Sequence, residues 1–219
     1  MKKLFVLVEG QTEETFVREL LSPHLYGFHL APTPVLLKTK RTKSGTSFKG
    51  GLTSYAKARN DIIALLHDSS AVAVTTMVDF YGLPKEFPGN ATCPAGTPYN
   101  RVRYVQQRWS EDIGDSRFLP FLVLHEFEAL LFAGTDAIAK ALPDYDVAGR
   151  LAIVRQQASS PEEIDEGPQT HPSAHILRCA PGYQKALDGP LVALEIGLSV
   201  IREQCPHFDA WVTKLEQLA

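Results

Sequence analysis

The sequence predicts an α/β protein built on a mostly parallel sheet, with helices on both faces and a helical C-terminal part. Apolar, β-branched runs of strand length alternate with helical segments in the order βαβαβαβ(α). These runs lack the clean apolar and polar alternation of a strand with one wet face, which is typical of parallel strands covered on both sides. The chain has 219 residues, of which 44% are hydrophobic, so it is long enough to bury a sizeable core.

The first half of the chain supplies the predicted strands and three helices. The strands are expected over residues 3–8, 34–39, 71–78 and 118–124. The first helix is expected to begin near Thr12, a good N-cap followed by Glu13 and Glu14 in the first turn, and to end at Pro23. Two more helices are expected over residues 52–68 and 99–109. In the second of these, the apolar residues at positions 102, 105 and 109 share one face.

The last third of the chain shows helical patterns only. Apolar residues recur at helical spacing on either side of a loop that is rich in Pro and acidic residues. Helices are expected over residues 135–142, 147–157, 190–205 and 207–218. We therefore expect an α/β core over residues 1–133 and a helical extension over residues 134–219 that packs on it.

Two stretches without acidic residues concentrate positive charge, although the formal net charge of the chain is −3. The first stretch lies between Glu19 and Asp61, and the second contains Arg101 in the helix expected over residues 99–109. The candidate phosphate-binding residues are Lys38, Lys40, Arg41, Lys43, Lys49 and Arg101. A solvated loop and a solubilising helix face remain the alternative interpretations of these charges.

Cysteine usage and hydropathy bear on the compartment. Cys93, Cys179 and Cys205 lie far apart in the sequence, which favours neither a disulfide framework nor a zinc site. The apolar stretch after Met1 is too short for a signal peptide, and no later run reaches the length of a membrane span. We expect a cytoplasmic protein that does not bind a membrane.

Acidic residues follow three of the predicted strands at the point where each strand ends. Glu9 follows the first strand, Asp79 the third, and Glu126 and Glu128 the last. In open α/β sheets, ligands bind beyond the carboxyl ends of the strands, so these carboxylates are expected to meet. Like charges held close together need a cation between them, and Mg²⁺ suits carboxylate oxygens combined with water and phosphate ligands. The alternative is that each acid caps the next helix, as we expect for Glu13 and its neighbour.

Several ordered motifs resemble a known family. The stretch "VEGQTEETFVRELL" resembles the first motif of the Toprim catalytic domain of OLD-family nucleases, and "MVDFYGLP" resembles its later acidic motif. The whole chain resembles a bacterial Toprim-like family of unknown function. In that family V-E-G-x-T-E, D-x-Y-x-x-P, H-E-F-E-A-L-L-F and a proline-rich stretch before a Tyr and a Lys recur in this order. The resemblance implies a Rossmann-like Toprim sheet.

The resemblance also implies roles for individual residues. Glu9 takes the place of the Toprim glutamate and Asp79 that of the first aspartate of the D-x-D motif, whereas Tyr81 stands where the second aspartate is usual. A further metal-binding carboxylate would come from Glu126, with Glu128 as the second choice. Two helical residues at this spacing point about 200° apart, so only one of them is expected to face the site.

The function that follows is metal-dependent phosphodiester chemistry with Mg²⁺ or Mn²⁺ as the cofactor. Lys185 is the candidate cation beside the metal, because Toprim-like nucleases use a lysine there. The resemblance implies DNA or RNA as the substrate and an AAA-type or ABC-type ATPase as a partner in phage defence. Two alternatives stay open: a non-catalytic module that binds nucleic acid or protein, and a phosphohydrolase that acts on nucleotides.

Overall fold

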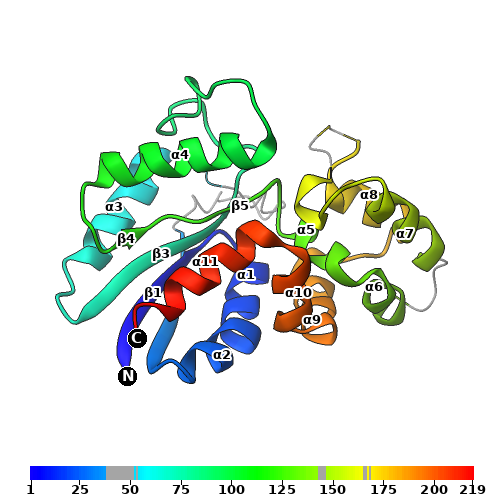
Figure 1. Ribbon diagram of the computed structural model, residues 1–219, viewed down its shortest axis with the longest axis horizontal. Helices are drawn as coiled ribbons and strands as arrows, with labels where there is room; N and C mark the ends of the chain where they lie inside the picture. The colour runs from blue at the N-terminus through cyan, green and yellow to red at the C-terminus, as the bar shows by residue number, and fades with distance from the viewer. Residues whose placement is uncertain (38–51, 53, 143–146, 165–166, 168) are drawn as a thin grey trace, which may run out of the picture.

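The computed structural model describes residues 1–37, 52, 54–142, 147–164, 167 and 169–219. It shows an α/β protein in which a parallel sheet is flanked by helices (Figure 1). The strand order is β2-β1-β3-β4, and β5 pairs with β3 beyond the end of β4. The strands are β1 (Lys2–Val8), β2 (Leu30–Leu36), β3 (Ala71–Asp79), β4 (Phe118–Leu119) and β5 (Leu122–Val123). The predicted fold class is therefore confirmed.

The helices lie on both faces of this sheet and beyond one end of it (Figure 1). Their bounds are α1 (Gln11–Phe16), α2 (Ser22–Tyr26), α3 (Tyr55–Leu66), α4 (Pro98–Ile113), α5 (Glu128–Leu131), α6 (Thr135–Ala141), α7 (Ala148–Gln156), α8 (Pro172–Cys179), α9 (Lys185–Ile196), α10 (Leu198–Gln204) and α11 (Pro206–Glu216). A π-helical turn (Val17–Leu21) joins α1 to α2, and 3-10 turns cover Phe132–Gly134 and Pro161–Glu163.

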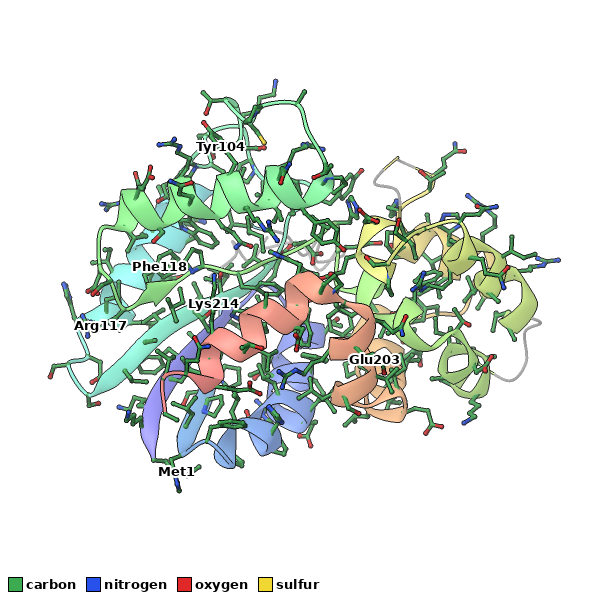
Figure 2. The ribbon with its side chains drawn as sticks, viewed as in Figure 1. Met1, Tyr104, Arg117, Phe118, Glu203 and Lys214 are labelled. Carbon is green, nitrogen blue, oxygen red and sulfur yellow. The ribbon has the colours of Figure 1, made fainter. Side chains whose placement is uncertain are left out.

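The central strands β1 and β3 are buried on both faces. Alternate residues of β1 enter two different cores: Val6 packs with α1, α2 and the C-terminal helices, whereas Leu7 packs with α3 and α4. In the second core, Val105 and Trp109 of α4 are fully buried, as the helical pattern predicted. Figure 2 shows side chains filling the space between the sheet and its helices. Burial on both faces explains why the sequence shows apolar runs without alternation.

The helices after residue 133 share the first core with the sheet. The rings of Phe16 and Phe208 pack edge to face, with their centroids 5.9 Å apart. Phe121 stacks on Trp211 of α11 with centroids 4.3 Å apart. Helix α11 therefore covers the same face as α1 and α2. The division of the chain at residue 133 stays a prediction.

Two predicted strands differ from the observed ones, and both contain proline. The strand expected over residues 34–39 runs from Leu30 to Leu36; its prolines are tolerated because β2 is an edge strand. The strand expected over residues 118–124 is interrupted at Pro120, which has no N–H to donate. There the Oγ1 of Thr76 accepts a hydrogen bond from the Phe121 N–H (2.8 Å) and replaces a ladder contact.

Several helices also differ from the expected ones. The first helix continues past Pro23, because the π-helical turn places this proline in the first turn of α2, where its missing N–H costs little. The helix expected over residues 190–205 begins earlier, at Lys185, and breaks at Gly197, whose φ of 83° favours glycine. The loop expected before it contains α8, which begins at Pro172.

No helix among the described residues is both long and apolar enough to cross a membrane.

Glu162, in the 3-10 turn Pro161–Glu163, caps the N-terminus of α11. Its carboxylate accepts hydrogen bonds from the N–H groups of His207 (2.8 Å) and Phe208 (2.9 Å) in the first turn of the helix. Burial raises the pKa of Glu162 to about 7. A carboxylate at this position satisfies two N–H groups that have no partner within the helix.

Glu162→Ala is expected to lower the free energy of unfolding by about 2 kcal/mol, because two buried N–H groups lose their acceptor. Urea unfolding measures the change. Glu163→Ala in the same turn is the control and should cost less than about 0.5 kcal/mol. Equal losses in the two variants would show that Glu162 does not act as the cap of α11.

Candidate functional site

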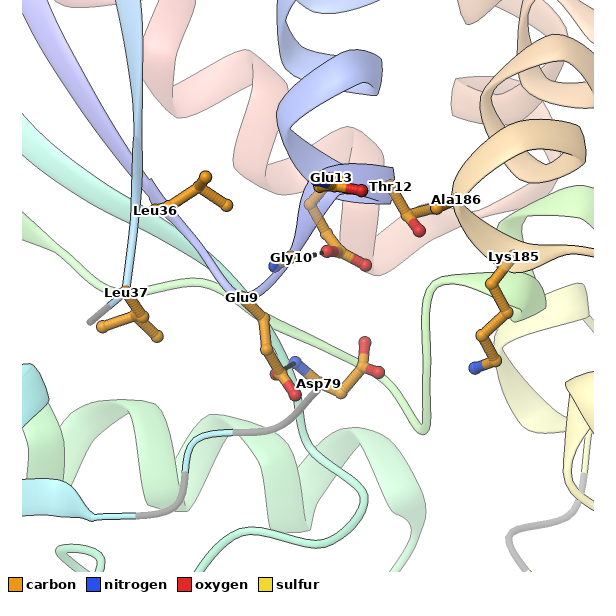
Figure 3. Close-up of a pocket in the computed structure, with 10 residues that line it drawn as sticks. Glu9, Gly10, Thr12, Glu13, Leu36, Leu37, Asp79, Lys185 and Ala186 are labelled. Atoms are coloured by element: carbon orange, nitrogen blue, oxygen red, sulfur yellow. Dashed lines mark hydrogen bonds between the residues drawn. The ribbon is translucent and has the colours of Figure 1, made fainter. Parts of the chain in front are cut away.

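A pocket of about 610 Å³ opens at the carboxyl ends of β1 and β3, the edge where ligands bind in open α/β sheets. Its lining residues are Glu9, Gly10, Gln11, Thr12, Glu13, Leu36, Leu37, Asp79, Lys185 and Ala186. Figure 3 shows the carboxyl groups of Glu9, Glu13 and Asp79 directed into one space, with Lys185 across from them. The ends of β1, β2 and β3 and the starts of α1 and α9 therefore build the pocket.

Glu9 follows β1 directly and ties it to β3. Its Oε2 accepts a hydrogen bond from the backbone N–H of Asp79 (3.0 Å), and the backbone of Leu52 also donates to its carboxylate. Gly10 then caps α1, and its N–H donates to Glu13 Oε2 (2.9 Å). A Cβ at Gly10 would lie 3.3 Å from that same oxygen, so a glycine keeps the turn open for the carboxylate.

Asp79 ends β3 and ties it to the start of α5. Its Oδ1 accepts a hydrogen bond from the N–H of Phe127 (3.0 Å). Its Oδ2 receives no hydrogen bond from any residue that the structure describes. Hydrogen bonds thus link Glu9 to Asp79 and Asp79 to Phe127. These bonds orient the two carboxylates and so determine the direction of their other oxygens.

The pocket carboxyls hold their protons more tightly than acids in water. Burial, followed by the nearby charge of Glu13, raises the pKa of Glu9 to about 7. Burial and the charge of Glu128 raise the pKa of Glu13 to about 7. Burial, Glu9 and Glu13 raise the pKa of Asp79 well above its usual value. Because each acid disfavours ionisation of its neighbours, the group as a whole favours a proton or a cation at neutral pH.

Lys185 brings positive charge to the pocket from the first turn of α9. Its Nζ donates to Glu128 Oε2 (2.8 Å) and to Glu126 Oε2 (3.0 Å). Burial alone would lower the pKa of Lys185, but Glu128, Glu126 and Asp79 raise it overall. Burial raises the pKa of Glu128, and Lys185 opposes this shift. Tyr183 donates its hydroxyl to Glu128 Oε1 (3.3 Å). Lys185 therefore stays charged and neutralises part of the acidic cluster.

Neither Glu126 nor Glu128 is among the residues that line the pocket, and the segment does not have the helical geometry on which the choice between them rested. Both reach Lys185, because α5 begins at Glu128 and the chain before it is not helical. His125 has a positive φ of 68°, which turns the chain between β5 and α5. Glu126 Oε1 also accepts from the N–H of Ser173 in the first turn of α8, and its Oε2 accepts from the Ser173 hydroxyl (3.1 Å).

Sequence reasoning missed three contributors to this site. Glu13 was expected only to cap a helix, but it is 7% exposed and its carboxyl group lines the pocket. The Gly-x-x-Glu spacing of a capping box was the available signal for its contact with Gly10. Ser173 was not predicted, because it reaches Glu126 only through the packing of α8. Tyr183 is the Tyr that precedes Lys185 in the family pattern, and this was the available signal for its contact with Glu128.

The expected phosphate-binding residues fall in different places. Lys38, Lys40, Arg41, Lys43 and Lys49 lie outside the described residues. The guanidinium of Arg101 lies 5.5 Å from the ring centroid of Phe80, the residue after Asp79. Tyr81, at the position of the second motif aspartate, stacks on His171 with centroids 5.7 Å apart.

The metal-binding capacity of the site rests on a few carboxylates. Within the described parts of the chain, no three His, Cys, Asp or Glu residues form a ready-made metal site. Glu126 and Glu128 are paired with Lys185, whereas Glu9, Glu13 and Asp79 have no ion pair with any Lys or Arg whose position the structure describes. Mg²⁺ is commonly bound by one or two carboxylates together with water and substrate phosphate oxygens, a requirement that these residues meet.

Comparison with known proteins identifies a family. Neither the curated proteins nor the solved structures include a match to this chain. A family model described as "Domain of unknown function (DUF4276)" matches residues 8–216, from the end of β1 to the end of α11. Since this segment contains the pocket and nearly all of the fold, the chain belongs to the DUF4276 family.

Proposed function

We propose that this protein is a Toprim-like, divalent-metal-dependent enzyme that hydrolyses phosphodiesters. One observation carries the proposal: partly buried acids from separate strand ends converge in one open pocket, where desolvation and the charges of neighbouring acids raise their pKa values. A fold gains no stability from gathering buried like charges, whereas a site that binds a cation requires them. The sequence resemblance to OLD-family nucleases points to the same chemistry.

Glu9 and Asp79 are the proposed metal ligands, and Mg²⁺ or Mn²⁺ the proposed cofactor. When bound, such an ion polarises a phosphodiester and lowers the pKa of a coordinated water. The N–H groups of Asp79 and Phe127 hold one oxygen each of Glu9 and Asp79, so both carboxylates are oriented in advance. Glu13 adds negative charge from the first turn of α1 and strengthens the attraction for a cation.

Lys185 is proposed to stabilise negative charge that develops on the phosphate. Its side chain is 47% exposed and lines the pocket, so part of it faces the space that a ligand would occupy. Glu126 and Glu128 are proposed to position this ammonium, with Glu126 in turn held by Ser173. Either acid would join the metal ligands only by releasing Lys185 toward the substrate.

A nucleotide phosphohydrolase is the second candidate, because a pocket of about 610 Å³ has the size of a small-ligand site. We favour a polynucleotide, since the resemblance is to nucleases. A cytoplasmic location and an AAA-type or ABC-type ATPase partner also rest on that resemblance and are part of the proposal.

Replacing a proposed metal ligand by its amide should abolish hydrolysis. Glu9→Gln and Asp79→Asn are expected to lower the Mg²⁺-dependent or Mn²⁺-dependent cleavage rate by about 100-fold or more, because each removes a charge from the metal site. Cleavage of single-stranded and duplex DNA, RNA and nucleotides by the purified protein is compared. Glu14→Gln is the control, since Glu14 pairs with Arg18 on the outer face of α1.

The control should cleave like the wild type. Full activity of both Glu9→Gln and Asp79→Asn would rule out this metal site. If the wild type binds nucleic acid but cleaves none of these substrates with either metal, the non-catalytic module is the correct interpretation.

The raised pKa values predict a specific dependence of stability on pH. A group whose folded-state pKa is raised stabilises the fold below its unfolded pKa, and this contribution is lost as the pH rises through the folded pKa. For Glu9 the loss falls between pH 4.5 and about 7. At a pH of about 7.5 without metal, Glu9→Gln should therefore be more stable than the wild type by roughly 2 kcal/mol, with no such gain at about pH 4.

Thermal and urea unfolding with EDTA or Mn²⁺ measures this difference. Glu162 and His207 also titrate in this range, but they are present in both proteins, so their effects cancel in the comparison. Mn²⁺ should raise the stability of the wild type and leave Glu9→Gln unchanged. Glu9 would instead have a structural role if the Glu9→Gln protein were less stable than the wild type at neutral pH and Mn²⁺ changed the stability of both proteins equally.

A further inference from the structure

A second groove, of about 410 Å³, lies at the open edge of the sheet between α4 and α11. In Figure 1 these helices lie on either side of β4 and β5, and Figure 2 labels Lys214 and Phe118 in this region. The polar residues that line the groove are Arg103, Gln106, Gln107, Ser110, His207 and Lys214. No aspartate or glutamate of the described chain lines it.

Two positive charges face this groove from opposite walls. Arg103 extends from α4 and Lys214 from α11, and both side chains are exposed. Neither forms an ion pair or hydrogen bond with a residue in the described ranges. Most other cations in the structure are paired, as Arg108 is with Glu111 on the same helix. Two uncompensated cations across a groove without acids attract an anion.

Hydrogen bonds hold His207 in place on the floor between these cations. His207 Nε2 donates to the Leu122 carbonyl oxygen (3.0 Å), and the backbone N–H of His207 is held by Glu162. Burial lowers the pKa of His207 to about 4, and Arg103 and Lys214 both contribute, which shows that their charges act on the same ring. The imidazole is therefore neutral at pH 7, and the positive charge of the groove comes from its two walls.

Additional hydrogen-bond donors accompany the two cations. Gln106 uses its Oε1 to accept from the Leu122 N–H (3.0 Å), an arrangement that leaves its amide NH₂ as a donor. The Ser110 hydroxyl supplies another donor to the same groove. A guanidinium, an ammonium, an amide and a hydroxyl together suit a tetrahedral oxyanion with several acceptor oxygens better than a planar carboxylate.

We propose that the groove between α4 and α11 binds the phosphate group of a nucleoside phosphate, with Arg103 and Lys214 clamping the phosphate. The volume exceeds that of a phosphate alone, and the partly exposed apolar residues Leu119, Pro120 and Ala210 provide a surface for an attached organic part. The phosphate belongs either to a free nucleotide or to a nucleic-acid strand. This site is separate from the carboxylate pocket and requires no metal.

Isothermal titration calorimetry in EDTA tests the site with three probes: inorganic phosphate, adenosine monophosphate and a short single-stranded oligonucleotide. Binding by the double variant Arg103→Gln/Lys214→Gln should be at least about 10-fold weaker than by the wild type, because two charge-assisted contacts are lost. Arg18→Gln/Lys140→Gln removes the same charge from exposed ion pairs elsewhere and should change the affinity by less than about 2-fold.

The probes separate the two sources of phosphate. Adenosine monophosphate that binds as tightly as the oligonucleotide indicates a free nucleotide, whereas tighter, salt-dependent oligonucleotide binding indicates a nucleic-acid strand. Trp211 fluorescence offers a second readout, since Trp211, although only 4% exposed, lines the groove, whereas Trp109 lies in the other core and does not. The Arg103→Lys variant keeps the positive charge and should retain part of the affinity. If the Arg103→Gln/Lys214→Gln protein does not fold, Arg103→Lys is measured in its place.

Three results would overturn the proposal. The Arg103→Gln/Lys214→Gln variant could bind the probes as tightly as the wild type, or the two double variants could lose affinity equally. The wild type could also fail to bind any probe at concentrations up to about 10 mM. A tetraglutamate peptide that displaces the oligonucleotide at the same concentration as adenosine monophosphate does would also overturn the proposal. Such a result would show that the groove binds anions in general.

Discussion

The burial of several carboxylates at the meeting point of β1 and β3 is the constraint on which this structure depends. Glu9 accepts the N–H of Asp79, and Asp79 accepts the N–H of Phe127, so the acids are part of the connections that hold two strand ends and α5 together. The same burial makes ionisation costly, and the pKa of Glu9 rises to about 7. The fold therefore holds acids that favour a cation at neutral pH.

The C-terminal helices complete the site as well as the core. Helix α9 places Lys185 against Glu126 and Glu128, and α8 places the N–H of Ser173 on Glu126. Helix α9 packs closely on α1: a Cβ at Gly189 would lie 3.1 Å from the Tyr183 hydroxyl and 3.2 Å from the side chain of Thr12. Removing these helices would expose the core and leave Glu126 and Glu128 without their cation. The positive charge beside the strand-end acids thus depends on packing from a distant part of the chain.

The sequence predicted those features that depend on local pattern. Apolar runs on both faces of the sheet indicated a parallel arrangement, and the acids after two strands indicated the pocket, because the carboxyl ends of parallel strands share one edge. Features that depend on tertiary contacts were not predictable. Glu13 has the sequence context of an ordinary helix cap, and only the packing around it shows that it is buried. The turn at His125, with its positive φ, brings both Glu126 and Glu128 to Lys185, which a helical extrapolation could not foresee.

The location of a bound metal tests the central claim most directly. Crystals soaked in Mn²⁺ and measured by anomalous diffraction should show a peak between Glu9 and Asp79, with a carboxylate oxygen of each at about 2.1 Å, the distance usual for Mg²⁺ sites. Lys185 should remain on Glu126 and Glu128 in that structure unless a phosphate is also bound. A pocket without an anomalous peak, with Glu9 and Asp79 still bound only to backbone N–H groups, would contradict the account. A Mn²⁺ ion bound only elsewhere on the protein would contradict it equally.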